Sequence, residues 1–320
     1  MTDLRELERL EAKFWRAPSA HNTQPWLLVY LPDRIELRYD PARALPAGDP
    51  TQRDLLLSLG AFVEAVLIAT SDLPISLEFE AGFDPVRRLV GVFVPAAARY
   101  ETQFTSDDLE RRQTSRLPYA RGRLGADELA IARAQIPPEV ELHDLASSDL
   151  VDLVREADRH LYESPEVVHE LRAWLRLSPR DPRYELDGLS YDCLDLGRLE
   201  AAAVDVLLRP HVYRAVRRLG LHRIFSSSTA RLLEPEGSVL ALVGSADSPE
   251  DALAHGRSLL RVWLALGSRG LYTHPLSQVL DCPATERELS SRLGATGGRR
   301  PMSLFRTGRS EPPPRSRRLR

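Results

Sequence analysis

The segment APSAHNTQPW, residues 17–26, carries a first set of side chains that could bind a ligand. Ser19, Asn22 and Gln24 offer hydrogen-bond donors and acceptors, and Pro18 and Pro25 stiffen the backbone around them. The segment favours neither helix nor sheet, and an apolar run, WLLVYL, follows at once. It has the chemistry of a rigid polar wall against a small molecule. A polar turn leading into a strand would have the same composition.

A second set lies in RRQTSR, residues 111–116. Arg112, Thr114 and Arg116 alternate, so an extended backbone would place two guanidinium groups and a hydroxyl on one side. That arrangement suits a phosphate monoester, because the guanidinium fork matches phosphate oxygens bidentately. A solvated run of charges is the alternative interpretation of the same residues.

A third set of side chains that could bind a ligand lies in the C-terminal stretch PPPRSRRLR, residues 312–320. Arg315, Arg317 and Arg318 follow three prolines, a composition typical of a disordered basic tail. Nucleic-acid binding is disfavoured, because no aromatic residues interleave with the arginines and the formal net charge of the whole chain is only -3.

The sequence lacks the signatures of several enzyme classes. It has no GxGxxG or Walker loop, no GxSxG nucleophile elbow and no HExxH pair. The FSSST run at residues 225–229 is more typical of a loop or a helix cap than of a nucleophile, and Cys193 and Cys282 are not spaced as a metal or redox motif. We therefore expect no metal site and no catalytic triad.

Composition places the chain among soluble globular proteins of one or two domains. Its 320 residues are 43% hydrophobic and 28% charged. The N-terminal segment lacks the apolar core of a signal peptide, and no apolar run is expected to span a membrane; AFVEAVLIAT is too short and contains Glu64. With two cysteines, a reducing cytoplasm is the expected location, without membrane or nucleic-acid partners.

Mixed helices and strands surround these segments and favour an α+β fold. A hairpin is expected around Pro32 and Asp33, and a buried helix is expected to start from Asp49 as N-cap with Pro50 in its first turn. A second capped helix should run from Ser248 to Gly270. The other expected elements are strands at 76–80, 88–96, 140–142, 237–246 and 301–308, helices at 127–134 and 148–175, and a polar loop at 178–190.

Taken together and in order, the segments resemble the nitroreductase-like FMN oxidoreductases, and more closely their single-chain, twin-domain Acg-type subgroup. APSAHNTQPW looks like the P-S-x-x-N-x-Q-P-W segment that lies against the flavin, and RRQTSR looks like an R-x-S/T-x-R/K phosphate motif. GLYTHPLSQ resembles the stretch that passes flavin N5, and the tail resembles a terminal K/R-x-R. The cofactor-binding residues implied are Pro18, Ser19, Ala20, Asn22, Gln24, Arg112, Thr114, Arg116, Leu276, Ser277, Gln278, Arg315 and Arg317.

The resemblance implies two fused nitroreductase-like halves, residues 1–108 and 109–320, with central sheets flanked by helices. Because the first motif occurs only in the first half and the phosphate motif only in the second, one shared site per chain is expected. Such a pseudo-dimer would need no partner, although further dimerisation stays open. The loop at about 176–192 is a candidate lid, with Trp174 and Tyr184 able to reach the ring.

The implied activity is transfer of electrons from NAD(P)H through FMN to a small nitroaromatic or quinone-like acceptor. In this scheme the flavin carries the chemistry, and no dedicated catalytic side chain is required. Arg116 would lie near the N1/O2 edge of the flavin, and a backbone N–H of Ser277 or Gln278 near N5. If the lid stays closed, no second ring can stack, and the alternative is a non-catalytic protein that sequesters or stores FMN.

Overall fold

The computed structural model describes residues 4–217, 230–233 and 235–320. Side chains of residues 4–6 and 217 are not described. The FSSST run at 225–229, expected to be a loop or cap, lies outside the described residues.

The first part of the chain forms an antiparallel sheet in the order β1-β2-β4-β3. The hairpin expected around Pro32 is β1 and β2, and Trp26 at the start of β1 stacks on Phe62 of α2 at 4.5 Å. The elements are η1 (Leu4–Leu10), α1 (Glu11–Phe14), η2 (Ala20–Asn22), β1 (Trp26–Tyr30), β2 (Ile35–Tyr39), η3 (Pro41–Arg43), α2 (Arg53–Ser71), β3 (Leu77–Asp84), β4 (Leu89–Pro95) and α3 (Ser106–Arg111).

The second part forms another antiparallel sheet, in the order β5-β8-β10-β9. Its elements are α4 (Ala126–Arg133), β5 (Glu141–Ala146), η4 (Ser147–Leu150), α5 (Val151–Glu163), α6 (Pro165–Ala173), β6 (Leu175–Arg176), β7 (Leu189–Ser190), α7 (Arg198–Leu207), α8 (Pro210–Arg217), β8 (Ser238–Ser245), α10 (Pro249–Gly267), β9 (Tyr272–Pro275), α11 (Gln278–Asp281), α12 (Pro283–Arg292) and β10 (Arg299–Gly308). Two antiparallel sheets with segregated helices confirm the α+β class.

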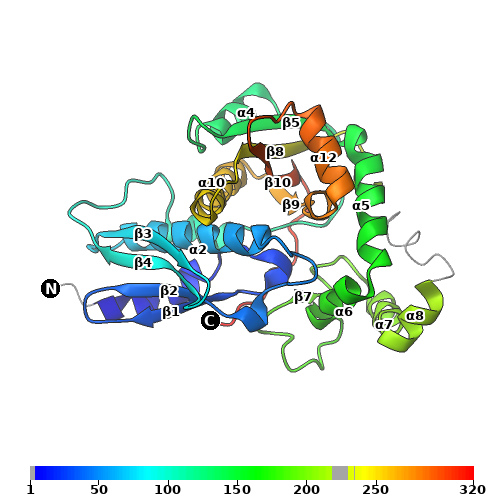
Figure 1. Ribbon diagram of the computed structural model, residues 1–320, viewed down its shortest axis with the longest axis horizontal. Coiled ribbons are helices and arrows are strands. Elements are labelled where there is room, and N and C mark those ends of the chain that lie inside the picture. Colours follow the sequence, from blue (N-terminus) through cyan, green and yellow to red (C-terminus); the bar gives the residue numbers. More distant parts are fainter. Residues whose placement is uncertain (1–3, 218–229, 234) are drawn as a thin grey trace.

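Two long helices join the sheets (Figure 1), since α2 packs against the first, α10 against the second, and the helices cross each other. The crossing is very close. A Cβ on Gly60 of α2 would lie 2.0 Å from the Leu253 carbonyl oxygen of α10, and one on Gly256 of α10 would lie 2.2 Å from that of Leu57. Both helices have 19 residues, and each glycine is the eighth residue of its helix. The backbones therefore meet through a reciprocal pair of glycines.

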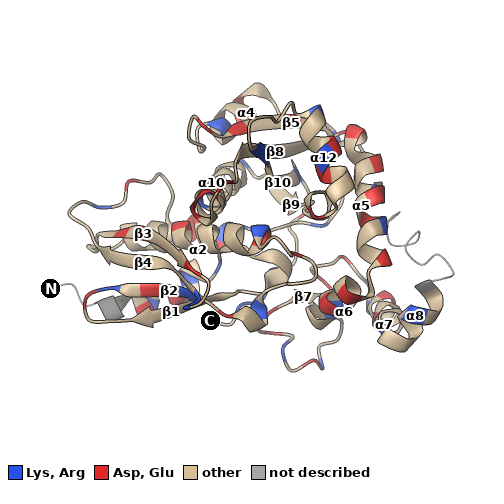
Figure 2. Cartoon of the chain, in the orientation of Figure 1, with Lys and Arg blue, Asp and Glu red and all other residues tan. Residues whose placement is uncertain are grey.

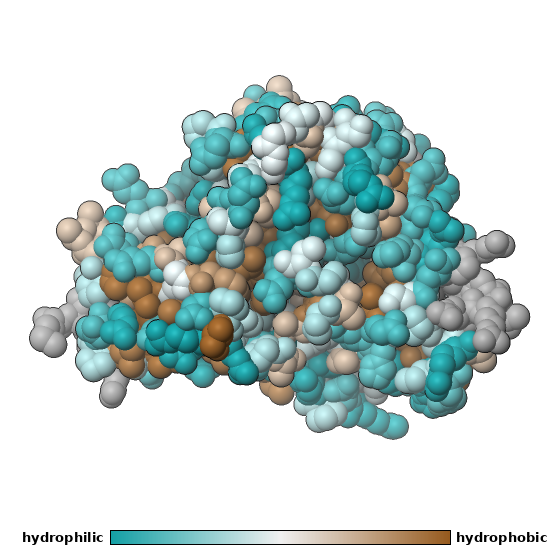
Figure 3. Space-filling view, viewed as in Figure 1, coloured by the Kyte–Doolittle hydropathy of each residue, from teal (hydrophilic) through white to brown (hydrophobic). Residues whose placement is uncertain are grey.

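The outer helices and the visible face are mostly hydrophilic. Basic and acidic residues alternate along α5 and α12 (Figure 2), and hydrophobic atoms on this face gather over the first sheet (Figure 3).

Three expectations about the helices are wrong in detail. The helix expected to start at Asp49 starts at Arg53, although Asp49 still accepts a bond from the Leu55 N–H at 2.8 Å. The helix expected over 148–175 is two helices, α5 and α6, because Ser164 adopts extended backbone before Pro165. Within the described ranges, α2 is long and apolar enough to cross a membrane, contrary to expectation, but 89% of that stretch is buried inside the protein.

Candidate functional site

A cavity of about 750 Å³ lies where most of the predicted segments meet. Its lining comes from the loop before β1, the start of α2, the segment after α3, the end of β9, α5, the residues after β7 and the C-terminal tail. Its volume falls in the range of small-molecule sites, which bury most of their ligand. The predicted residues that line it are Pro18, Ser19, Ala20, Asn22, Arg112, Thr114, Arg116, Ser277 and Gln278.

The loop that forms one wall is held in an unusual backbone conformation. His21, Asn22 and Gln24 all have positive φ, at 48°, 55° and 52°, which is uncommon for residues other than glycine. Two hydroxyls stabilise the loop: Ser19 Oγ accepts from the Gln24 N–H at 2.9 Å, and Ser58 Oγ of α2 accepts from the Ala20 N–H at 3.3 Å. Clustered backbone strain of this kind is typical of ligand-binding segments.

The segment after α3 is extended and lies beside β9. Thr114 forms a parallel bridge with Thr273, and the Ser115 N–H donates to the Thr273 carbonyl at 3.1 Å. This pairing brings Arg112 and Arg116 to the same cavity as the residues that follow β9. The alternation predicted from the sequence therefore does place two guanidinium groups and the Thr114 hydroxyl along one cavity wall.

One end of the cavity has a concentration of positive charge. Arg112 and Arg318 line it, and Arg16 lies behind them; Arg112 and Arg318 both donate to the Arg16 carbonyl, at 3.0 and 3.3 Å. In the described part of the chain, no carboxylate lies within 4.0 Å of these guanidinium groups or of that of Arg116.

Arg16 and Arg112 are buried and Arg318 is half-buried, and among the described residues none of the three has a carboxylate partner. The Nε atoms of Arg16 and Arg112 are buried without a hydrogen-bond partner. Burial, together with repulsion from Arg16, lowers the pKa of Arg112 to about 9. Burial, together with repulsion from Arg16 and Arg112, holds the pKa of Arg318 well below its usual range. Such an arrangement is costly unless an anion binds there.

The tail supplies this end of the cavity through different residues from those expected. Arg318 and Ser316 line it, whereas Arg315 is exposed and donates to the Glu110 carbonyl at 3.4 Å. Arg317 points to Glu185 and Asp192, at 3.1 and 3.3 Å. Neither Arg315 nor Arg317 lines the cavity.

Two further predicted residues support the cavity without lining it. Gln24 is completely buried: its Nε2 donates to the Leu186 carbonyl at 3.0 Å and its Oε1 accepts from the Leu319 N–H at 2.9 Å. It therefore ties the loop to both the lid and the tail. Leu276 is buried in the core below the second sheet.

Another part of the lining is acidic. Arg53 donates to Asp54 at 2.7 Å and to Asp281 at 2.8 Å, and Asp49 lies beside them. One guanidinium cannot neutralise three carboxylates, so burial and the neighbouring negative charges raise the pKa of Asp49 to about 7 and that of Asp281 to about 8. Within the described ranges, no group of three or more His, Cys, Asp and Glu side chains could hold a metal ion.

The candidate lid covers the loop and is bonded to it. Asn22 Nδ2 donates to the Gly188 carbonyl at 3.0 Å, and the Gly188 N–H donates back to the Asn22 carbonyl at 3.2 Å. Asp187 of the lid is buried and forms ion pairs with Arg43, Arg176 and Arg183.

The two lid aromatics do not line the cavity, although the sequence suggested that they could reach a bound ring. Trp174 packs among the guanidinium groups of Arg43, Arg176 and Arg183. The guanidinium carbon of Arg317 lies 5.2 Å from the centre of the Tyr184 ring.

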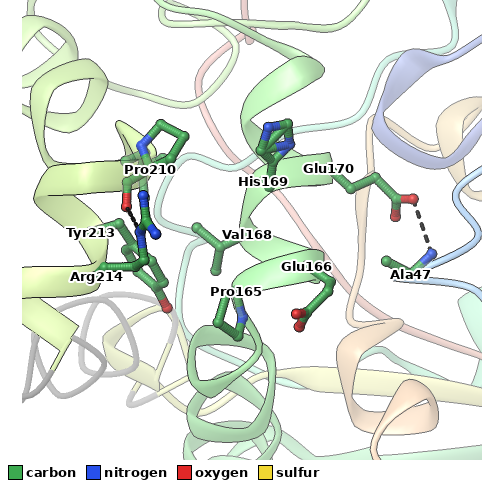
Figure 4. Close-up of a pocket in the computed structure, with 10 residues that line it drawn as sticks. Ala47, Pro165, Glu166, Val168, His169, Glu170, Pro210, Tyr213 and Arg214 are labelled. Atoms are coloured by element: carbon green, nitrogen blue, oxygen red, sulfur yellow. Dashed lines mark hydrogen bonds between the residues drawn. The ribbon is translucent and has the colours of Figure 1, made fainter.

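A smaller cavity of about 450 Å³ lies between α6 and α8, and none of the predicted residues lines it. In Figure 4, Pro165 and Val168 of α6 lie opposite Pro210 and Tyr213 of α8. Glu170 reaches away from them and accepts from the Ala47 and Gly48 N–H groups at 3.0 and 2.7 Å. Glu170 therefore joins α6 to the loop that leads to Asp49, beside this cavity.

Several cavity residues were not predicted. Arg16 and His21 adjoin or lie within the first motif, and Arg318 lies within the tail motif, so their positions carried a signal. His274 lies within the quoted GLYTHPLSQ stretch, so its position also carried a signal. Arg53 and Ser58 had none, because they reach the cavity only through the packing of α2.

Comparison with known proteins gives sequence relatives over part of the chain. No family model matches. A Mycobacterium tuberculosis protein named "Putative NAD(P)H nitroreductase" is 28% identical over 165 residues, 50% of this chain and 48% of the relative. A second protein of that organism, named "Putative NAD(P)H nitroreductase acg", is 34% identical over 109 residues, 33% of each chain. The chain thus spans about half or less of the length of these relatives.

Solved structures give weaker likenesses. An FMN-bound nitroreductase from Bacteroides fragilis is 12% identical, with a TM-score of 0.38, and covers 67% of this chain and 93% of that one. The FMN-dependent nitroreductase NfnB from Mycobacterium smegmatis, in complex with NADPH, is 14% identical with a TM-score of 0.35, covering 66% and 95%. These scores are too low to decide the fold.

The sequence relatives confirm the resemblance to nitroreductases, Acg-type included, that the motifs predicted.

Proposed function

We propose that this nitroreductase-like chain binds one FMN in the 750 Å³ cavity and passes electrons from NAD(P)H to a small nitroaromatic or quinone-like acceptor. The observation that carries the proposal is the group of buried guanidiniums without a carboxylate at one end of that cavity. A phosphate monoester is dianionic near neutral pH and supplies the missing charge.

The residues present fit that phosphate. Arg112 and Thr114 both line the cavity, with Arg112 Nη1 3.5 Å from the Thr114 hydroxyl oxygen, and the Nε of Arg112 is buried without a partner. Arg318 adds a third group from the tail, already oriented by Asn22 Oδ1 at 2.7 Å. Charge-assisted hydrogen bonds of this type are about twice as strong as neutral ones.

The loop and the start of α11 would hold the ring. The flavin, when bound, supplies the capacity to accept a hydride and to pass on one or two electrons. The chain binds and orients it: the strained loop keeps its polar groups in place, and Arg116 adds positive charge on the same wall. In the described part of the chain, the N–H groups of Ser277 and Gln278 donate to no protein acceptor, which leaves them free for a ligand.

A second function is favoured by one observation, the bonding of the lid to the loop. Asn22 and Gln24 each donate to a lid carbonyl, so opening the lid breaks buried hydrogen bonds. If the lid does not open, the cavity holds FMN but admits neither nicotinamide nor acceptor. The protein would then sequester or store flavin.

The absorbance spectrum of the purified protein tests both functions. About one FMN per chain, bleached by anaerobic addition of NADPH or NADH and recovered on adding a quinone or nitroaromatic compound, would establish the reductase. Bleaching by dithionite but not by nicotinamides would favour the holding function. A colourless protein that takes up no added FMN would overturn both.

A further inference from the structure

His274 of β9 lies directly opposite Arg306 of β10, as a cross-strand pair. Arg306 Nε donates to His274 Nδ1 at 3.0 Å. Arg306 is itself fixed, because its guanidinium donates to the Leu117 carbonyl at 2.9 Å and lies 4.1 Å from the centre of the Tyr119 ring. The imidazole is therefore oriented by a residue that is 2% exposed.

This contact determines the tautomer. A guanidinium can only donate hydrogen bonds, so His274 Nδ1 must accept, and the ring proton must be on Nε2. His274 is nine-tenths buried and lines the large cavity, and no described residue accepts from its Nε2. The N–H is thus a donor whose partner is missing from the protein.

Burial and the surrounding charges keep the ring neutral. Burial is the main cause that holds the pKa of His274 well below its usual value, and repulsion from Arg116 on the segment after α3 and from Arg306 on β10 adds to it. Tyr119 packs on Arg306 and carries no charge near neutral pH, since tyrosine ordinarily ionises near pH 10 and burial raises its pKa further. A third cation between two arginines would be strongly disfavoured.

We propose that His274 is a permanently neutral hydrogen-bond donor that presents its Nε2–H to an acceptor atom of the cavity ligand. The ligand atom is a ring nitrogen or carbonyl-type oxygen of a conjugated system, which gains negative charge on reduction. This rests on the proposed function for the identity of the ligand. The atom belongs either to the FMN ring or to the electron acceptor that stacks on it.

Histidine ¹⁵N NMR on the full chain tests the donor directly, with His274→Gln used to assign its signal. A neutral ring protonated at Nε2, unchanged from pH 5 to pH 8, is expected, and its Nε2 signal should shift on adding FMN or the acceptor. A proton on Nδ1, or titration near pH 6.5, would overturn the proposal. The tautomer and the protonation state are measured without bound flavin. A failure to bind FMN would therefore contradict the proposed function, while the NMR measurement would still establish the state of His274.

Two variants then identify which ligand is contacted. His274→Phe keeps a planar aromatic ring but removes the donor, and His274→Gln retains an amide N–H. If the flavin is the partner, His274→Phe weakens FMN binding about 3–10-fold, the range expected for one hydrogen bond, and lowers the flavin midpoint potential, while His274→Gln recovers most of both. If the acceptor is the partner, FMN binding is unchanged and only kcat/KM for the acceptor falls.

His143→Phe, on β5 and outside the cavity, is the matched control and should change neither quantity. Circular dichroism melts establish that each variant is folded. A folded His274→Phe protein equal to wild type in FMN affinity, midpoint potential and kcat/KM would overturn the proposal.

Discussion

Arg318 and Arg315 are three residues apart in the tail but lie in different surroundings. Arg318 lines the cavity beside Arg112, whereas Arg315 is exposed. We predict that Arg318→Ala weakens FMN binding by about 1–3 kcal/mol, because a charge-assisted contact to the phosphate is lost. Arg315→Ala should leave the affinity within error. Fluorescence titration of the deflavinated protein with FMN measures both.

Riboflavin provides a control for this prediction, because it has the same ring but no phosphate. Arg318→Ala should barely change riboflavin affinity. Equal weakening for riboflavin and FMN would mean that Arg318 maintains the loop through Asn22 instead of binding phosphate.

Asp281 gives stability a pH dependence that can be isolated by substitution. Burial and the nearby charge of Asp54 raise its pKa to about 8 in the folded protein, whereas an unfolded aspartate ionises near 4. The folded state therefore binds more protons between these values, and stability falls as pH rises through this window. One proton of difference between the two states changes the free energy of unfolding by roughly 1.4 kcal/mol per pH unit. Between pH 6 and pH 8, the wild type should therefore lose about 2 kcal/mol more of its free energy of unfolding than Asp281→Asn does.

Urea unfolding of both proteins at pH 6, 7 and 8 measures this difference. Buried histidines such as His21, whose pKa burial lowers to about 4, change stability in the opposite direction near pH 6, but equally in both proteins. Parallel stability curves for wild type and Asp281→Asn would contradict the prediction.

Sequence alone indicated which side chains lie together where they alternate along one extended segment. Arg112, Thr114 and Arg116 reach the cavity together because an extended backbone fixes their side. The tail has no such constraint, because three arginines lie within four positions and the sequence does not decide which of them faces the cavity. Only tertiary contacts select Arg318 over Arg315 and Arg317. Arg16 adjoins the first motif, but the absence of a hydrogen-bond partner for its buried Nε could be recognised only in the structure.

The crossing of α2 and α10 depends on glycine. A methyl group on Gly60 would lie 2.0 Å from the Leu253 carbonyl oxygen, so Gly60→Ala must push the helices apart. We predict a loss of about 3 kcal/mol in the free energy of unfolding, at the upper end of overpacking costs. Gly267→Ala, at the exposed end of α10 with no atom within 4 Å of a new Cβ, is the matched control and should change stability by less than about 1 kcal/mol. A Gly60→Ala protein as stable as wild type in urea would contradict the close crossing.

Helix boundaries were less predictable than the existence of helices. The cap at Ser248 was recognised from its residue type and is present, with the Asp251 N–H donating to Ser248 Oγ at 3.1 Å. The break at Pro165 was missed because the apolar periodicity continues through it, and Ser164 serves as the new cap. Strand order within each sheet had no local signal, because pairing depends on contacts distant in sequence.

At the scale of the molecule, the two parts have matching plans. Each has a four-stranded antiparallel sheet and a 19-residue helix with a glycine at its eighth position. These features support the proposal of two fused halves divided near residue 108. They also explain how each half contributes to the cavity without a partner chain, since the loop and α2 come from one half and the arginine segment and tail from the other.

The core, however, is shared. Leu253, Leu260 and Leu264 of α10 pack in the same cluster as α2 and the first sheet. Glu64 of α2 is completely buried and accepts from Arg257 and Arg261 of α10, at 2.9 and 3.1 Å. Separating the halves would expose an apolar helix and leave Glu64 without its cations.

We therefore predict that residues 1–108 produced alone do not fold cooperatively, whereas co-expression with residues 109–320 yields a soluble one-to-one complex. Thermal melts followed by circular dichroism and light scattering measure folding and mass. Glu64→Gln in the co-expressed pair should weaken the complex, because the neutral amide loses both ion pairs. A cooperatively folded, monomeric 1–108 fragment would mean that the halves are independent domains. In that case, the buried contacts of Glu64 would be a consequence of the fusion and would not be needed for either half to fold.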